Sequence, residues 1–149
     1  MTIDLSNAKL IGKGGERDCY QHPLNPNLCI KITVRAPANK KTQNIREPFY
    51  YKLLTKQGID WTHIARYHGR VMTNRGEGLI FDLPPDPDGK PSHTLELAIE
   101  RKLIEPMEVK TKLEELHDYL NKYLILTYDL RPGNVILNTK KREKKTYNN

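Results

Sequence analysis

The segment from Asp129 to Asn134 places the strongest constraint on the fold of this 149-residue chain. It reads DLRPGN and lies between the apolar stretches YLILT and NVILN, so it predicts a tight turn between two short strands. The spacing D-x-x-x-x-N brings a carboxylate and an amide to one turn. Phosphoryl transfer uses a carboxylate to accept a hydroxyl proton and oxygen ligands to hold Mg²⁺. A surface turn built on Pro132-Gly133 would favour the same residues without any chemistry, and both interpretations stay open on this segment alone.

Two features near the start of the chain fit the same chemistry. Gly12 and Gly14 lie in the run GKGG, which is typical of a hairpin turn and also of a loop that covers phosphate. Lys31 lies within LCIKITV, a run that predicts a strand because it alternates and is rich in β-branched residues. Its side chain is expected on the face opposite Ile30 and Ile32, either in solvent or in a site.

The remaining patterns predict several strands with one inserted helix, followed by further helices. The run EPFYYKLLTKQG predicts a helix with Pro48 at its first position and Gly58 as its stop. Strands are expected in LIGKGGERDCY, HIARYHGRVMT and GEGLIFDL, and a short helix from Leu95 to Lys102. A longer helix should carry an apolar stripe at three- and four-residue steps, formed by Val109, Leu113, Leu116, Leu120 and Leu124. The expected fold class is α+β with two unequal lobes.

The net charge of +7 is concentrated at one end of the chain. Residues 138–149, NTKKREKKTYNN, hold five basic residues and one acidic residue, which predicts a basic, disordered tail over 139–149 and leaves the body an unsuitable binder of nucleic acid. No apolar run approaches the ~20 residues that cross a bilayer, so membrane insertion is not expected. The N-terminus lacks the pattern of a secretory signal, and the expected location is the cytoplasm.

The two cysteines, Cys19 and Cys29, are not spaced as metal ligands. A structural disulfide is disfavoured in a cytoplasmic chain. We expect both to be small buried side chains on adjacent strands.

The order of these features is that of a protein-kinase-like fold: a glycine turn, a strand lysine, a helix with an acid near its start, and a D-x-x-x-x-N loop. The chain also resembles the PhoP regulatory network protein YrbL family, bacterial proteins with a kinase-like fold. The resemblance covers about residues 8–138 and is carried by LIGKGGERDCYQHP, CIKI, IREPFYYKLL, RYHG, DGKPSHTLELA and DLRPGNVIL. RYHG and DGKPS-x-TL are not general kinase features, so they make the resemblance specific.

The resemblance implies a nucleotide site with ATP and Mg²⁺ as cofactors. Gly12 and Gly14 would belong to the phosphate-covering loop, and Lys31 would hold the α- and β-phosphates. Glu47 would be the helix glutamate that pairs with Lys31, and the segment from Leu79 to Leu83 would face the adenine ring.

The resemblance also assigns roles in the D-x-x-x-x-N loop. Asp129 would be the catalytic base and Asn134 a Mg²⁺ ligand, while Arg131 would steady the transferred phosphate. The kinase-like domain would span residues 1–138, with an N-terminal antiparallel sheet lobe to about residue 83 that holds one helix. An incomplete helical lobe would follow over about 92–138.

Three departures from the kinase pattern limit the expected activity. Arg17 stands where a third glycine would be, and Pro48 should push Glu47 out to the helix cap, which weakens its expected bond to Lys31. After Leu137 the chain offers no aspartate for Mg²⁺, so we expect a chain truncated at its C-terminus.

Three functions therefore stay open. The first is a kinase-like nucleotide-binding protein with weak or absent phosphotransfer and a regulatory role. The second is a regulatory module that binds a protein partner and no nucleotide. The third, which we favour least, is a protein that binds nucleic acid or a membrane surface through its basic tail.

Overall fold

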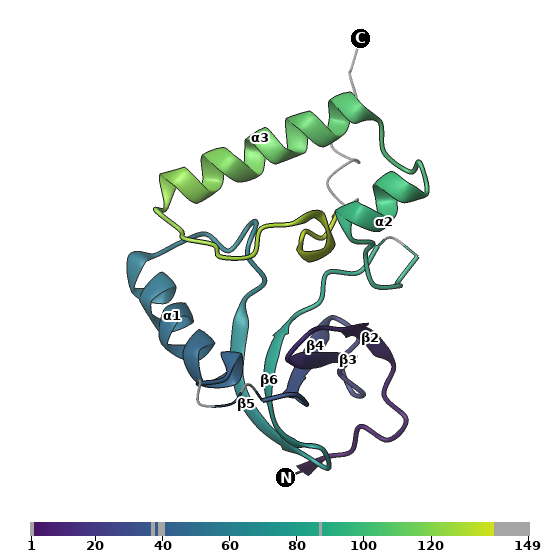
Figure 1. Ribbon diagram of the computed structural model, residues 1–149, viewed down its shortest axis with the longest axis vertical. Helices are drawn as coiled ribbons and strands as arrows, with labels where there is room; N and C mark the ends of the chain where they lie inside the picture. Colours follow the sequence, from purple (N-terminus) through teal and green to yellow (C-terminus); the bar gives the residue numbers. More distant parts are fainter. Residues whose placement is uncertain (1, 37, 39–40, 87, 139–149) are drawn as a thin grey trace. The chain divides into compact units, whose positions relative to one another are not determined.

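The computed structural model describes residues 2–36, 38, 41–86 and 88–138. These residues form two compact units, one up to Pro84 and one from Pro85 onward. The first unit holds all the strands and helix α1, and the second holds helices α2 and α3 (Figure 1). The predicted basic tail, 139–149, lies outside the described residues, and the predicted lobe boundaries stay predictions.

The first unit is built on a six-stranded sheet with the strand order β1-β5-β6-β4-β3-β2. Neighbouring strands are antiparallel except for β1, which pairs parallel to β5. The α+β class is confirmed, but the expected antiparallel sheet is mixed, because Thr2 and Ile3 add a short parallel strand at the edge of β5. The strands are β1 (Thr2–Ile3), β2 (Leu10–Lys13), β3 (Arg17–Gln21), β4 (Leu28–Thr33), β5 (Tyr67–Thr73) and β6 (Gly76–Asp82).

The glycine hairpin and the lysine strand are both confirmed. Strands β2 and β3 pair antiparallel, and the turn between them closes where the amide of Gly14 donates to the carbonyl of Arg17 at 2.7 Å. Strand β4 lies between β3 and β6, so Lys31 is in the interior of the sheet rather than at its edge.

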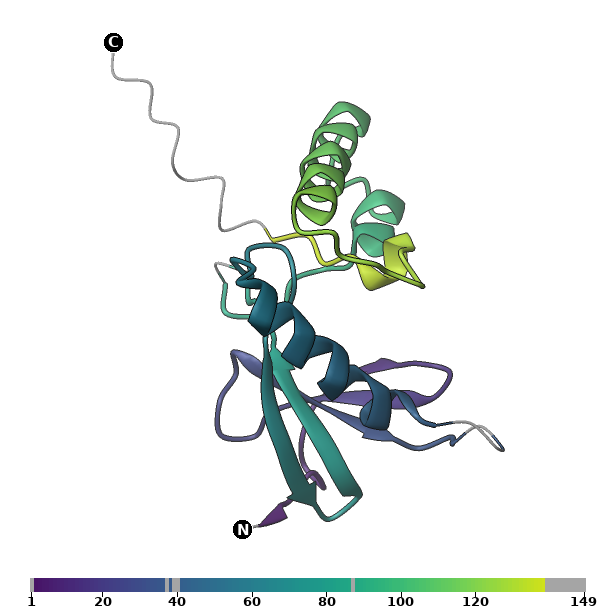
Figure 2. The same cartoon turned by 90° about the vertical axis from the view of Figure 1, so that its left-hand side faces the viewer.

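Alternation along the strands gives the sheet two apolar faces. One face is covered by the N-terminal segment and is formed by Leu5, Tyr20, Ile30 and Ile32, with Ile3, Ala8, Val71 and Ile80 packed against them. The other face is formed by Cys29, Leu79, Phe81 and Leu83, with Ile11, Cys19, Tyr51 and Tyr67 packed against them. Tyr51 comes from α1, which runs across this second face in Figure 2. The predicted adjacent strands of the cysteines are confirmed, and Cys29 is buried as expected, but Cys19 is only half-buried.

Helix α1 spans Gln43–Gln57, so the prediction that it begins at Pro48 is wrong. A proline inside a helix leaves the carbonyl of the residue four positions earlier without its amide partner. Here that carbonyl belongs to Asn44, and the Nη2 atom of Arg70 donates to it at 3.3 Å. A side chain from β5 thus occupies the place of the missing amide and allows the helix to begin before its proline. The predicted stop is confirmed, since Gly58 caps the helix with φ of 69°.

The second unit contains α2 (Leu95–Glu100), α3 (Pro106–Lys122) and the short 3₁₀ turn η1 (Pro132–Asn134). The hydroxyl of Thr94 accepts from the amide of Leu97 at 3.2 Å and caps α2. The predicted helices are confirmed in position, although α2 ends at Glu100 and α3 ends before Leu124. Among the described residues, no helix is long and apolar enough to cross a membrane.

The prediction of two short strands around the D-x-x-x-x-N turn is wrong. Residues 123–127 form no strand, and residues 135–137 pair instead with the segment that precedes α2. The amide of Leu95 donates to Val135 O at 2.7 Å, and the amide of Leu137 donates to His93 O at 2.9 Å. This pairing places Leu137 in the core of the unit, with Leu95, Ala98 and Ile104.

Among the glycines of the strands, Gly78 is the one where an added Cβ atom would have the closest neighbours, which generates a stability prediction. A Cβ atom at this position would lie 2.5 Å from Cγ2 of Ile30, a side chain with few rotamers on a strand. We expect Gly78→Ala to lower the free energy of unfolding by about 1–3 kcal/mol in urea titrations. Gly15→Ala is the matched control, because a Cβ atom there meets nothing within 4 Å and the change should stay within about 0.5 kcal/mol. Equal unfolding midpoints for the two variants would contradict this account.

Candidate functional site

Lys31 lies on the face of the sheet that α1 covers. It alternates with Ile30 and Ile32, which belong to the opposite face, and its Nζ atom lies 4.4 Å from the centroid of the Phe81 ring. The side chain is half-buried, so the alternative of a fully solvated strand lysine does not describe it. A cation at this distance is attracted by the ring, which keeps the ammonium beside the sheet.

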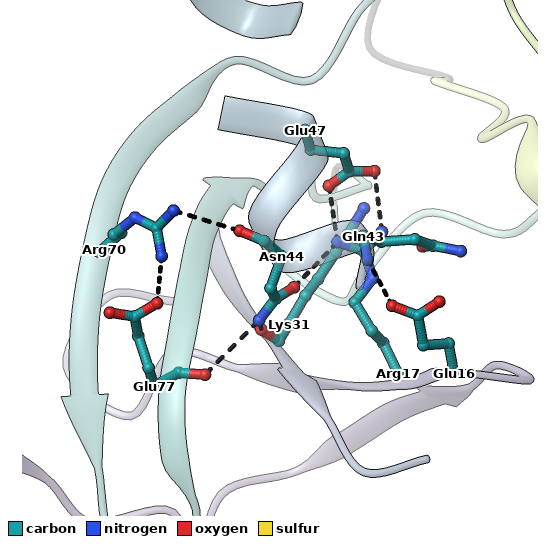
Figure 3. Close-up of polar contacts among 8 residues, drawn as sticks. All are labelled: Glu16, Arg17, Lys31, Gln43, Asn44, Glu47, Arg70 and Glu77. Carbon is teal, nitrogen blue, oxygen red and sulfur yellow. Dashed lines mark hydrogen bonds and ion pairs between the residues drawn. The ribbon is translucent and has the colours of Figure 1, made fainter. Parts of the chain in front are cut away.

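Glu47 lies inside α1, so the expectation that it caps the helix is wrong. The helix begins at Gln43 because Arg70 satisfies the carbonyl that Pro48 leaves open. The carboxylate of Glu47 accepts two hydrogen bonds from Arg17, at 2.6 Å from Nη1 and 2.9 Å from Nη2. Within the described ranges no ion pair joins Glu47 to Lys31, and Arg17 is its partner instead (Figure 3).

Arg17 holds the position of the missing third glycine, and its role was not predicted. Its side chain is only 10% exposed, and its Nη1 atom also donates to Asn44 Oδ1 at 3.2 Å. A bidentate pair of guanidinium and carboxylate is among the stronger polar contacts in proteins. The signal in the sequence was a long cation at the end of a glycine turn, on a strand next to the one that precedes the helix.

Asn44 connects the first turn of α1 to the middle of the sheet. This buried side chain donates from Nδ2 to the carbonyls of Lys31, at 3.2 Å, and Glu77, at 3.5 Å. Arg70 pairs with Glu77 as well as with the carbonyl of Asn44, and Glu16 accepts from the amide of Gln43. The start of the helix is therefore bound to the sheet by side chains from several strands (Figure 3).

The glycine turn is held by a second arginine that sequence reasoning missed. Arg35 donates from Nη2 to Gly14 O at 2.7 Å and from Nε to Gly15 O at 3.0 Å. It also pairs with Asp18 at 2.8 Å. The turn is thus ordered by contacts to its carbonyls. At Gly12 there is room for a side chain, since no atom of the described residues beyond its immediate chain neighbours lies within 4 Å of where a Cβ atom would be.

In the second unit, the turn brings the three predicted loop residues together. Asn134 donates from Nδ2 to the backbone carbonyl and to Oδ2 of Asp129, both at 2.9 Å. Arg131 lies 3.2 Å from the same Oδ2 atom, and all three side chains are exposed. The spacing D-x-x-x-x-N therefore predicted a real cluster, held by its own polar contacts.

The residues predicted for one nucleotide site belong to different units. Gly12, Gly14, Lys31 and Glu47 lie in the first unit, and Asp129, Arg131 and Asn134 lie in the second. Their convergence around a nucleotide stays a prediction, as do their catalytic roles. In the parts of the chain that the structure describes, no cluster of three or more His, Cys, Asp or Glu residues could hold a metal ion.

Comparison with known proteins identifies a family over nearly the whole chain. The family model described as PhoP regulatory network protein YrbL matches residues 3–148. The YrbL proteins of Escherichia coli (strain K12) and Shigella flexneri are each 38% identical to this chain over 136 residues. The aligned region covers 90% of this chain and 65% of each relative. The chain thus spans about two thirds of the length of the curated relatives that it matches.

The geometry of the Arg17–Glu47 pair predicts that it matters for stability. Arg17→Ala removes both hydrogen bonds to a half-buried carboxylate, and we expect it to lower the free energy of unfolding by about 2 kcal/mol. Arg131→Ala is the matched control, since its pair with Asp129 is 67% and 63% exposed and should contribute less than about 1 kcal/mol. Urea titration of both variants provides the measurement. A loss as small for Arg17→Ala as for Arg131→Ala would show that the pair does not anchor the helix.

Proposed function

Because the chain belongs to the PhoP regulatory network protein YrbL family, we propose that it is a kinase-like nucleotide-binding protein with a regulatory role. Its phosphotransfer is weak or absent. The observation that carries this proposal is the position of Lys31, on the face of the sheet that α1 covers and on the second strand after the glycine turn.

The order of elements in the first unit supports nucleotide binding. A glycine hairpin, a strand with an inward-facing lysine, a covering helix and a second hairpin follow one another, as in the smaller lobe of a protein kinase. In such a lobe the lysine binds the α- and β-phosphates and the glycine loop covers them. Lys31, Gly12 and Gly14 would take these roles here, and Leu79 and Leu83 would lie near the adenine ring.

The loop of the second unit supports the same proposal with a different set of groups. Asp129 would accept a hydroxyl proton, Asn134 would offer Oδ1 to Mg²⁺, and Arg131 would neutralise a transferred phosphate. The Nδ2 atom of Asn134 donates to Asp129, so Oδ1 is the atom of Asn134 that would bind the metal. Mg²⁺ in kinase sites uses one or two carboxylates as well as phosphate oxygens.

The Arg17–Glu47 pair is the reason to expect weak catalysis. In protein kinases the strand lysine must pair with a helix glutamate before the phosphates are held correctly. Glu47, the one glutamate within α1, is bound by both the Nη1 and Nη2 atoms of Arg17. Lys31 rests instead on Phe81, so it can attract phosphate but lacks the acid that would orient it.

The same pair supports a second function, a regulatory interaction module without nucleotide. Arg17, Asn44 and Arg70 hold α1 against the sheet through contacts between groups of the protein itself. A scaffold that is already ordered in this way does not need ATP to present a surface to a protein partner. Binding of a purified partner that is unaffected by Lys31→Ala would favour this function over the first.

Thermal unfolding with and without Mg-ATP distinguishes the two functions. For a dissociation constant of about 1 mM, about 10 mM Mg-ATP stabilises the native state by about 1.4 kcal/mol, which raises Tm by roughly 3–5 °C. We expect this shift for the wild-type chain and its loss in Lys31→Met, which keeps an apolar contact with the Phe81 ring. Lys52→Met, at an exposed position of α1, is the matched control and should keep the shift.

Two results would reject the proposed site. The absence of any shift in the wild-type chain would exclude nucleotide binding and favour the interaction module. An equal shift in wild type and Lys31→Met would place the nucleotide away from Lys31. Mg²⁺ alone and ATP alone complete the measurement, because a kinase-like site binds the two together.

A further inference from the structure

The two cysteines lie together on the face of the sheet that carries Lys31. In the antiparallel pair of β3 and β4, Cys19 is opposite Lys31 and Cys29 is opposite Gln21, so the cysteines are diagonal neighbours. Diagonal residues of an antiparallel pair share one face of the sheet, with their Cα atoms about 7–8 Å apart and their Cβ atoms somewhat closer. Both cysteines pack in the cluster that contains Leu79 and Phe81.

Their surroundings make the two thiols unequal. The Cys29 thiol donates to the backbone carbonyl of Asp82, with 4.0 Å between the Sγ and O atoms. The neighbouring Cys29 thiol lowers the pKa of Cys19, the charges of Lys31 and Arg17 act in the same direction, and burial opposes them. The neighbouring Cys19 sulfur and burial raise the pKa of Cys29. Cys19 is also the more accessible residue, since Cys29 is only 3% exposed. The geometry thus provides a half-buried sulfur beside the charges of Lys31 and Arg17, with a second, more deeply buried thiol on the same face of the sheet.

We propose that Cys19 and Cys29 are a peroxide-reactive dithiol, a modification site that hydrogen peroxide converts to a disulfide. The Cys19 thiolate attacks one peroxide oxygen, the O–O bond breaks, and the released hydroxide takes up a proton to form water. Cys19 then carries a sulfenic acid. The Cys29 sulfur attacks the sulfur of that group, its proton joins the departing hydroxide as a second water, and the S–S bond forms. Two thiols lose two electrons in total, and one peroxide gains them.

A disulfide needs Cα atoms within about 6.8 Å of each other, so the bond would draw β3 and β4 slightly closer together at this point. The cysteines are already on hydrogen-bonded neighbouring strands, and the bond closes only the short segment of residues 20–28. A dithiol reductant would reverse it by thiol–disulfide exchange. This face of the sheet therefore has two covalent states, a dithiol before reaction with peroxide and a disulfide after it.

The sequence around the cysteines makes the reaction direct to measure. Trypsin cleaves after Arg17 and after Lys31 but finds no Lys or Arg between them, so one peptide, residues 18–31, contains both cysteines. In the reduced protein this peptide should take up two alkyl groups after denaturation. After treatment with hydrogen peroxide we expect the peptide to lose two hydrogen atoms and to take up no alkyl group. Dithiothreitol should restore both alkylation sites.

Two variants assign the order of the steps. Cys29→Ser keeps the accessible sulfur but removes the second thiol, so we expect a sulfenic acid at Cys19 that dimedone traps. Cys19→Ser should show slow oxidation at Cys29, because that thiol is buried and protonated. Circular dichroism of the oxidised wild type gives the state of the fold, so the result does not depend on how well either variant folds.

Three results would overturn the proposal. The first is a wild-type peptide 18–31 that gains oxygen atoms at the same rate as in Cys29→Ser, without loss of alkylation at Cys29. The second is a disulfide found only in covalent dimers on a non-reducing gel. The third is an internal disulfide that appears only after the circular dichroism signal of the native sheet has been lost.

The disulfide does not depend on nucleotide binding, but its effect on Lys31 rests on the proposed function. Since Cys19 is the strand partner of Lys31, we expect the oxidised chain to show a smaller Tm shift with Mg-ATP than the reduced chain. An unchanged shift would overturn this coupling and leave the disulfide itself in place. A reduced chain without any shift would instead count against the proposed nucleotide site, while the mass of peptide 18–31 still decides on the dithiol.

Discussion

The bidentate ion pair between Arg17 and Glu47 is the interaction on which the first unit most depends. It joins the strand after the glycine turn to the helix that covers the sheet, at 2.6 and 2.9 Å. Such a pair has a defined geometry, because the planar guanidinium fits both carboxylate oxygens at once. Helix α1 covers the face on which strand alternation places Lys31, Phe81 and the two cysteines. The proposed nucleotide site and the proposed dithiol therefore both lie on the face that this contact helps to cover.

The parts of the fold that the sequence predicted correctly are those that local patterns determine. The glycine turn, the alternation in β4, the stop at Gly58 and the cluster of Asp129 with Asn134 each depend on residues close in the chain. The errors arose where a distant group changed the outcome. Arg70, on another strand, supplies the donor that lets α1 extend past Pro48 toward its N-terminus. The segment after Asn134 pairs with residues that precede α2, which no local pattern indicated.

The elements that carry Lys31 and Glu47 were predicted, but the pairing of these side chains was not. Lys31 lies on β4, where its carbonyl accepts from Asn44 of α1, and Glu47 lies in the same helix. Their ion pair was expected from the kinase pattern, whereas in the structure Glu47 pairs with Arg17. Arg17 was noticed only as a missing glycine. Arg17 stands where the kinase motif has a third glycine. The position loses the flexibility of glycine but gains a cation that pairs with Glu47.

The proline in helix α1 has a mechanical consequence. Pro48 has no amide hydrogen, so one backbone hydrogen bond of α1 is missing. The guanidinium of Arg70 donates to the Asn44 carbonyl in its place. The first turn of α1 is thereby bound to strand β5. The rest of the helix follows the position where the hydrogen bond between the Pro48 nitrogen and the Asn44 carbonyl is missing. Bending here would strain one backbone hydrogen bond fewer than at other points of α1, so a change of angle between the first turn and the rest of the helix costs least at Pro48.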